Sequence, residues 1–543
     1  MGDRQLPQYH QNNLSPPKID KQSLQAIFRE LQSAIRHAVE LLQNNVSLPD
    51  DPKEYGSIYS GTAGVALAFM RLHYQAKSLV MDDDPPMPDF GALTRERVLP
   101  TGPPVRLDTK RFSPLGTRKF GAVYVRSLEK CFFKRKNAEV HLRANDVGDI
   151  AAVEMHASRD AEIPPIYRYP DEPESPGEEV LYGRAGLLWA LLNLQAHPFD
   201  NGNQYSFRWV FAHTKSLIDA IIINGKISRT KTWVEKHGEE GPLPLTWMRE
   251  DGRCNLGAIH GVCGTLTILL QCSEWDLEPD EKSSHYPIIA DTITELCKIC
   301  ISNNGHLPTS LPVRPSKRAS PLVQICHGVP GLLLLLATAK NFSYIAKYEQ
   351  PEWNEALRLG TERVWEEGLL SKGGGVCHGH AGNAWPFLLL HVVHGYSKKG
   401  LEQTPKPEAE SSTQIGGHVT RSAGRKKASA EEDSPGDSYL SKALAMLLYA
   451  RKTQPFSDSA EARRNFRIPD RPYSLFEGLA GTVCAWADAC VVIRMRLRKM
   501  ELAEELGRPL TQEDMKTDET WEQHSARLLG IVGFGGMGLT GGL

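Results

Sequence analysis

Short glycine-containing phrases recur along the chain, and each of them precedes a run of apolar residues. In every phrase two glycines are separated by two other residues, and a run such as VALAFMRL, LLWALLNL or LLLLLATA follows. Six copies are clear, and their glycine pairs are Gly61 and Gly64, Gly183 and Gly186, Gly261 and Gly264, Gly328 and Gly331, Gly379 and Gly382, and Gly478 and Gly481. Self-similarity of this kind predicts a repeat architecture.

The apolar runs predict helices that are hydrophobic on nearly every side, and such helices must be buried. The stretches between the phrases contain amphipathic segments, including residues 23–43, 216–223 and 353–368, which suit an outer layer. Strand-type alternation is scarce. We therefore predict an all-α fold in which helix pairs close into a double-layered α/α barrel, or toroid.

The spacing of the phrases is uneven, although residues 1–543 are predicted to form a single barrel domain. The long interval between Gly64 and Gly183 contains a Pro-, Asp- and Arg-rich stretch, residues 81–170, without a copy of the phrase. We interpret it as either an atypical insertion or a degenerate second repeat. The last interval contains residues 401–437, which are polar and aperiodic and therefore predict a disordered insertion.

Composition and charge narrow the class of protein. The 543 residues include 63 basic and 65 acidic side chains, and the formal net charge of −2 gives no overall attraction to nucleic acid. Ten cysteines are too sparse for a disulfide scaffold, and no secretory signal is recognised, which predicts reduced thiols and a cytoplasmic location. The longest apolar stretches, such as Gly331–Ala339, are too short to span a bilayer.

Two consecutive phrases carry the residues that point to chemistry. Cys326-His327-Gly328 and Cys377-His378-Gly379 place a thiol and an imidazole at the same point of two repeats, and His260-Gly261 is a third related pair. Cysteine and histidine are the preferred protein ligands of zinc. A single Cys-His-Gly more often reflects a buried thiol in a tight turn. Two copies on one repeat framework favour a metal site.

The ordered set YGRAG, HGVCG, CHGVPG, CHGHAGN and SLFEGLAG resembles the lanthionine synthetase C-like (LanC-like) family, whose members are toroids of seven helix pairs around a zinc ion. The resemblance covers most of the chain. It implies that the zinc ligands are Cys326, Cys377 and His378. It also implies that His327 and His260 are acid/base candidates and that Glu179 is a supporting carboxylate.

Three protein ligands leave one tetrahedral position of zinc open, which is typical of a catalytic site. The resemblance implies that a substrate thiol takes this position. Its thiolate would add to an electron-poor alkene such as a dehydroamino acid, and an imidazole would protonate the resulting enolate. The expected reaction is a thioether-forming addition, catalysed by a zinc-dependent transferase or lyase.

Two residues favour a eukaryotic-type member, which implies glutathione as the thiol partner. Lys372 lies five residues before Cys377, where such members carry a basic residue implicated in glutathione binding, and Arg4 resembles their N-terminal arginine. Glutathione has two carboxylates, which suit a lysine and an arginine. The bacterial members instead close lanthionine rings in peptides.

The chain departs from the family at two places. The family's second repeat normally carries a Cys-Gly-x-x-Gly phrase, whereas residues 106–145 occupy that slot here, so either the segment hides a degenerate helix pair or it lies outside a competent barrel. Ile325 stands where the family usually has an aromatic residue. Five further cysteines lie in apolar helical patterns and are predicted to be core thiols: Cys263, Cys297, Cys300, Cys484 and Cys490.

Three functions compete. The first is a zinc-dependent transferase that adds glutathione to dehydroamino acids in peptides or proteins. The second is a non-catalytic glutathione- and zinc-binding regulator that contacts other proteins, peripherally at the plasma membrane. The third, an α/α-barrel glycosidase or prenyltransferase, predicts paired carboxylates or a different zinc triad and ranks low. An acid/base group beside the open zinc position favours catalysis over regulation.

Overall fold

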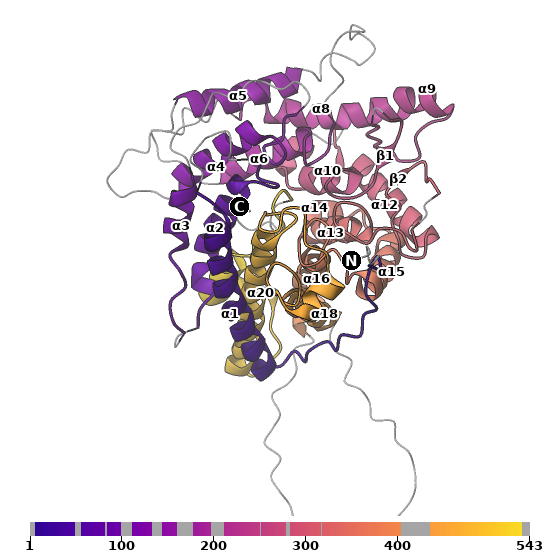
Figure 1. The fold of residues 1–543 in the computed structure, drawn as a ribbon. Coiled ribbons are helices and arrows are strands. Elements are labelled where there is room, and N and C mark those ends of the chain that lie inside the picture. The colour runs from indigo at the N-terminus through magenta and orange to yellow at the C-terminus, as the bar shows by residue number, and fades with distance from the viewer. Residues whose placement is uncertain are drawn as a thin grey trace, which may run out of the picture.

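The computed structural model describes residues 6–48, 56–81, 84–98, 111–132, 144–159, 177–196, 211–249, 251–278, 283–315, 318–402 and 435–534. Within these residues seven inner helices follow one another around a ring (Figure 1). They are α2 (Thr62–Gln75), α4 (Arg118–Phe132), α6 (Arg184–Ala196), α10 (Val262–Leu269), α13 (Val329–Asn341), α16 (His380–Gly395) and α20 (Leu479–Leu506). Helix α20 packs against α2, which closes the ring. The prediction of an all-α toroid is confirmed.

A second, outer helix precedes each inner helix in the sequence. The outer helices are α1 (Lys21–Asn45), α3 (Phe90–Arg97), α5 (Ala144–Arg159), α8 (Thr214–Ile227), α12 (Tyr286–Ser302), α15 (Pro351–Glu367) and α18 (Pro435–Ala450). Helix α1 buries one apolar face, and in Figure 1 it lies beside the C-terminal α20. Amphipathic outer helices thus cover the apolar inner ones, as the hydrophobic pattern predicts.

The remaining elements are short. They are the single turns η1 (Ala76–Ser78) and η3 (Ser228–Thr232), the helices α9 (Trp233–His237), α11 (Glu274–Leu277), α14 (Ser343–Ala346), α17 (Lys398–Glu402), α19 (Ala460–Asn465), α21 (Gln512–Thr517) and α22 (Glu519–Ser525), and the two strands β1 (Cys254–Asn255) and β2 (Ser310–Leu311). The strands pair antiparallel between two of the ring loops. Among the described helices, none combines the length and the apolar character needed to cross a membrane.

Backbone hydrogen bonds join the seven loops that lead into the inner helices. Each loop donates an amide to a carbonyl of the next: Tyr59 to Leu115 (2.9 Å), Gly116 to Leu181 (2.9 Å), Val180 to Ile259 (3.2 Å), Ala258 to Ile325 (3.0 Å), Cys326 to Cys377 (3.3 Å), Cys377 to Phe476 (2.8 Å) and Phe476 back to Tyr59 (3.2 Å). The chain therefore closes on itself at one end of the barrel, and loops far apart in sequence are held in fixed register.

The second repeat is present in a degenerate form. Helix α4 packs between α2 and α6, and α3 covers α2 next to it. The loop before α4 has Thr117 where the other loops have their first glycine, and its next glycine is Gly121, one residue later than in the phrase. The described part of residues 81–170 contains helices α3, α4 and α5. Because these two changes disrupt the glycine phrase, the sequence pattern does not reveal this repeat.

The second glycine of the phrase is required by close packing. A Cβ atom added at Gly64 would lie 2.0 Å from the carbonyl oxygen of Ile58, and one added at Gly264 would lie 1.7 Å from that of Ala258. Any side chain there would push the helix away from its own loop. The phrase is therefore a structural signature of the loop-to-helix junction, and the chemistry depends on the residues that precede it.

The C-terminal segment after α22 lies inside the barrel. Leu529, Ile531, Val532 and Phe534 are all buried. The backbone amides of Leu529 and Gly530 bind the carboxylate of Asp488 on α20, at 3.2 and 2.8 Å. Residues 528–534 form what we call the C-terminal plug, which fills the interior beneath the ring of loops.

Helices α17 and α18 flank the predicted insertion, and they show that its two ends are ordered. Leu401 is buried against Leu502 and Met515, and the carboxylate of Asp437 binds the guanidinium of Arg496 at 2.8 and 2.9 Å. The predicted boundaries of the insertion, residues 401 and 437, therefore lie within the two flanking helices, and the insertion is shorter than predicted. Residues 403–434 lie outside the described residues.

Replacing residues 403–434 with a short Gly/Ser linker is expected to change the free energy of unfolding by less than about 1 kcal/mol, because the cost of a loop grows slowly with its length. Urea denaturation would measure this. The matched control removes residues 401–437 and should be clearly less stable, since it also deletes Leu401 and Asp437. Equal destabilisation by both deletions would show that the polar segment itself is ordered and packed.

Candidate metal and thiol site

The ring loops present two successive side chains immediately before their first glycine, or before Thr117 in the second loop. The residues two positions before it are Tyr59, Leu115, Leu181, Ile259, Cys326, Cys377 and Phe476. The residues directly before it are Ser60, Gly116, Tyr182, His260, His327, His378 and Glu477. Polar and sulfur-containing side chains are thus concentrated on one side of the ring, and the hydrogen-bonded loops bring them together.

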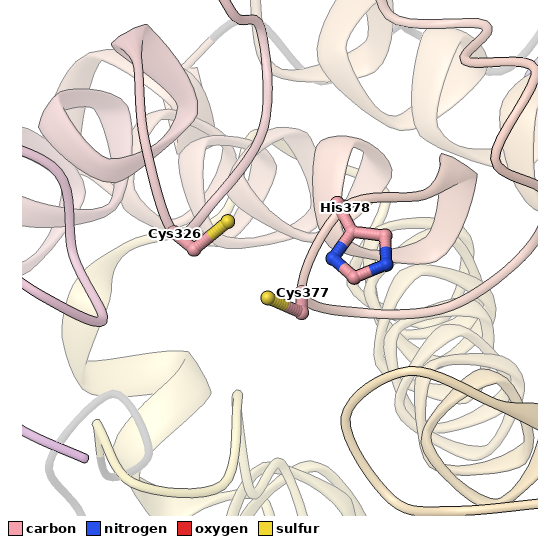
Figure 2. Close-up of side chains that lie close together, drawn as sticks. All are labelled: Cys326, Cys377 and His378. Carbon is pink, nitrogen blue, oxygen red and sulfur yellow. The ribbon is translucent and has the colours of Figure 1, made fainter. Parts of the chain in front are cut away.

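Cys326, Cys377 and His378 form the tightest group. Their ligand atoms all lie within 4.8 Å of one another, and the cysteines are 4% and 2% exposed. In Figure 2 the three side chains, which come from two neighbouring loops, point toward a common space. Two thiols and one imidazole at this separation fit the donor set and the size of a tetrahedral zinc site with one position left for another ligand. The sequence-predicted ligands are therefore brought together.

The two thiols differ in acidity. Burial raises the pKa of Cys326, but its hydrogen bond with Cys377, the charge of Lys372 and the hydrogen bond from Gln324 outweigh burial and lower it. The hydrogen bond with Cys326 and burial raise the pKa of Cys377 well above its ordinary value. Nε2 of Gln324 donates to Sγ of Cys326 at 3.0 Å. Cys326 is thus the more acidic member of a pair that shares a proton.

His260 and Glu179 form a hydrogen-bonded pair beside this group. Nδ1 of His260 lies 2.6 Å from Oε2 of Glu179, a residue of the preceding ring loop. Burial lowers the pKa of His260, but the hydrogen bond and charge of Glu179 and the charge of Cys377 outweigh it and raise the pKa overall. The acid/base candidate His260 and the candidate supporting carboxylate Glu179 are thus in direct contact.

His327 stacks on His260, with ring centroids 5.2 Å apart and planes at 20°. Burial, together with the charges of His260 and Lys372, lowers the pKa of His327 to about 4. Its Nδ1 atom is buried and has no hydrogen-bond partner among the described residues. His327 is therefore a neutral imidazole at physiological pH, and His260 is the imidazole that a carboxylate orients.

Lys372 is half-buried in the loop that leads to Cys377. Its charge lowers the pKa of both Cys326 and His327, which places the ammonium near the metal group. The neighbouring Ser371 anchors the N-terminal arm, since its hydroxyl donates to the carbonyl of Pro7 at 2.5 Å. Arg4 lies outside the described residues, so its role in glutathione binding stays a prediction.

The structure adds residues that sequence reasoning missed. Tyr59 stacks on Phe476, with centroids 4.7 Å apart, and burial, followed by the charge of the nearby Cys377, raises the pKa of its hydroxyl above the ordinary value. Tyr59 occupies the same position of its loop as Cys326 and Cys377 do of theirs, so alignment of the phrases would have found it. Gln324 carries no comparable signal in the sequence.

The other cysteines whose side chains the structure describes are buried, as is Ile325. Cys254, Cys263, Cys297, Cys300, Cys484 and Cys490 are fully buried. Burial is the largest cause of the raised pKa of each, as in Cys263 and Cys490. Ile325 is also fully buried, and its side chain faces Gly382 at the start of α16. The aromatic residue expected at position 325 is therefore replaced by a core residue.

Comparison with known proteins yields one family and several relatives. Residues 156–406 match the family described as lanthionine synthetase C-like protein. A Danio rerio protein named glutathione S-transferase LANCL1 is 26% identical over 314 residues, which cover 57% of this chain and 58% of the relative. An Arabidopsis thaliana protein named LanC-like protein GCL1 is 27% identical over 314 residues, covering 57% and 54%. The matched region thus spans little more than half the length of these relatives.

Proposed function

Because the chain belongs to the lanthionine synthetase C-like family, we propose that it is a zinc-dependent transferase that adds glutathione to dehydroamino acids in peptides or proteins. The observation that carries the proposal is the convergence of Cys326, Cys377 and His378 within 4.8 Å. The name of the Danio rerio relative supports glutathione as the thiol. Zinc held by these three residues would lower the pKa of the incoming thiol and so provide the thiolate at neutral pH.

In the proposed reaction a new bond forms between the glutathione sulfur and the β-carbon of the alkene. The π electrons of the alkene move to the α-carbon and its carbonyl, and a proton then returns to the α-carbon. His260 would give this proton from Nε2 of its protonated ring, because Glu179 binds Nδ1 and leaves Nε2 for the substrate. Lys372 binds a carboxylate of glutathione as a point charge.

Metal analysis and a conjugation assay test the proposal together. Purified protein should carry about one zinc per chain, because two thiolates and one imidazole make a high-affinity site. Cys326→Ala and Cys377→Ala should lose most of it, and both should lose glutathione addition to a dehydroalanine peptide. Cys300→Ala, which removes a buried thiol elsewhere, is the control. Full zinc occupancy in a variant that combines Cys326→Ala with Cys377→Ala would refute the site. Zinc and glutathione binding by the wild-type protein without conjugation would favour a binding-only regulator.

Lys372→Ala is expected to weaken glutathione binding while leaving zinc in place. A charge-assisted hydrogen bond contributes roughly 1.5–3 kcal/mol, so the Kd for glutathione should rise about 10- to 100-fold. Calorimetric titration with glutathione, combined with zinc analysis, measures both effects. Lys298→Ala, which removes a lysine exposed on α12, should change neither. Loss of zinc in Lys372→Ala would instead give this lysine a role in forming the metal site.

A further inference from the structure

The N-terminal arm, residues 6–19, lies across two outer helices before α1 begins. In Figure 1 it runs as an indigo trace from α15 to the start of α1. Nδ2 of Asn12 donates to the carbonyl of Trp365 on α15 at 2.5 Å, and the hydroxyl of Ser441 on α18 donates to the carbonyl of Pro17. The first described residues of the arm instead bind loops of the metal site.

Lys372 is displayed by a tight turn in the loop that leads to Cys377. The amide of Gly373 donates to the carbonyl of Leu370 at 3.2 Å. Ser371 and Lys372 are therefore the two central residues of a β-turn. The position of the lysine thus depends on what holds the residues on the first side of this turn.

The N-terminal arm pairs with the first side of the turn. Tyr9 and Leu370 form an antiparallel bridge. The amide of His10 donates to the carbonyl of Leu369 at 2.8 Å. Antiparallel pairing fixes one segment against the other along its length. The arm therefore holds the turn from one side.

Ser371, the residue directly before the lysine, is bound almost entirely by the arm. Its hydroxyl donates to the carbonyl of Pro7 at 2.5 Å, and its amide donates to the carbonyl of Gln8 at 3.4 Å. Its own carbonyl accepts the amide of Arg467 at 2.8 Å. Ser371 is 2% exposed, so these contacts replace water. Loss of the arm would leave a buried hydroxyl and a buried amide without partners.

Gln8 extends the arm to the loop of the other metal cysteine. Its Nε2 donates to the carbonyls of Ser320 and Pro321, in both cases at 3.1 Å. These two residues lie shortly before Cys326 in the same loop. Because the backbone carbonyl of Gln8 binds the turn while its side chain binds this loop, a single residue joins the two.

We propose that residues 7–10 are a strap that sets the position of Lys372 relative to the metal group, and that Gln8 is its main positioning residue. The inference rests on the proposed function, in which Lys372 binds a carboxylate of glutathione while the sulfur takes the open zinc position. A lysine that is held in place loses less freedom on binding, which favours affinity. The strap should act on glutathione and not on zinc, since the bond between the Cys326 amide and the Cys377 carbonyl joins the metal loops independently.

Gln8→Met tests the strap, because methionine keeps the length of the side chain and removes the donor amide. The Kd of the zinc-loaded protein for glutathione should rise about 3- to 10-fold, as for the loss of one neutral hydrogen bond, and zinc content should stay unchanged. Ser371→Ala, which removes the donor to Pro7, should give a similar rise. Gln350→Met, which removes a surface amide bound to the carbonyl of Tyr348, is the matched control and should leave the Kd unchanged. Calorimetric titration with glutathione and zinc analysis measure these effects.

A double-mutant cycle shows whether Gln8 acts through Lys372. In the Lys372→Ala background, Gln8→Met should not raise the Kd further, because the group that it positions is gone. A residue that stabilises bound glutathione in another way would raise the Kd by the same factor in both backgrounds. Hydrogen exchange without glutathione gives a second readout, since the Gly373 amide that closes the turn should exchange faster in Gln8→Met.

The outcomes separate this inference from the proposed function. An unchanged Kd in Gln8→Met, unchanged exchange at Gly373, or a rise in Kd that persists in the Lys372→Ala background would each overturn the inference alone. Loss of zinc from Gln8→Met would also overturn it, since the strap would then hold the metal loops themselves. Wild-type protein that binds no glutathione would overturn the inference together with the proposed function.

Discussion

Replacing His260 with alanine is expected to lower the rate of glutathione addition by about 10²- to 10⁴-fold, the usual contribution of general acid catalysis, while zinc content stays unchanged. The reason is geometric. Glu179 binds Nδ1 of His260 at 2.6 Å and so orients the imidazole. It also raises the pKa of His260 against the effect of burial, so a larger fraction of the imidazole carries the proton at neutral pH.

Glu179→Gln provides a separate test of the same pair through pH dependence. The carboxylate raises the pKa of His260, and its removal should lower that pKa. The reaction needs the protonated imidazole, which is lost as pH rises through the pKa. The fall in conjugation rate on the alkaline side should therefore move to lower pH in Glu179→Gln. A pH profile of kcat/KM for the zinc-loaded protein measures this shift, and an unchanged profile would contradict the role of Glu179.

His327→Ala is the comparison that assigns the acid. The resemblance offers both His327 and His260, and His327 directly follows a predicted zinc ligand. Burial and neighbouring cations hold the pKa of His327 near 4, so it is not a proton donor at neutral pH. We expect His327→Ala to retain more activity than His260→Ala. The opposite order, with zinc intact in both variants, would make His327 the acid.

The repeat fold is predictable from sequence because its constraints are local. The second glycine of each phrase leaves no room for a Cβ atom and lies at the start of an apolar helix, so both features recur at the six junctions that carry the phrase. The sequence pattern does not reveal the second repeat, because Thr117 replaces the first glycine of the phrase and Gly121 lies one residue too late for the second. The backbone hydrogen bonds of this loop nevertheless close the ring. Backbone hydrogen bonds tolerate many side chains, so sequence patterns record them poorly.

The site is predictable only in part. Cys326 and Cys377 share a motif, which predicts that they converge. The contact between Glu179 and His260 depends on the register of two adjacent loops, and family resemblance suggested the residues without giving their geometry. Tyr59 differs in residue type from the cysteines at the same loop position, and Gln324 is a local contact with no repeated counterpart. Contacts between side chains of different repeats can therefore be identified only from the structure.

Asp488→Ala is expected to lower the free energy of unfolding by about 3–5 kcal/mol, because it removes the shared acceptor of several buried hydrogen-bond donors, and each buried donor left without a partner costs roughly 1–3 kcal/mol. Asp488 and Arg71 are both fully buried inside the barrel. Burial raises the pKa of Asp488, and the charge of Arg71 acts against this effect. The carboxylate also accepts hydrogen bonds from Gln75 at 2.6 Å and from Nε1 of Trp385 at 2.8 Å.

The loss should be concentrated in the C-terminal plug, because the same carboxylate holds the amides of Leu529 and Gly530. Urea denaturation of Asp488→Ala measures the total effect, and hydrogen exchange at these two amides shows whether the plug is released. Glu501→Ala, which removes an exposed carboxylate from the same helix, should change stability by less than about 0.5 kcal/mol. A loss below about 1 kcal/mol in Asp488→Ala would contradict the role of this buried carboxylate. Since the plug packs at Gly533 against Leu115 and Phe476 of the ring loops, its release should also weaken zinc binding, although Asp488 itself lies outside the metal group.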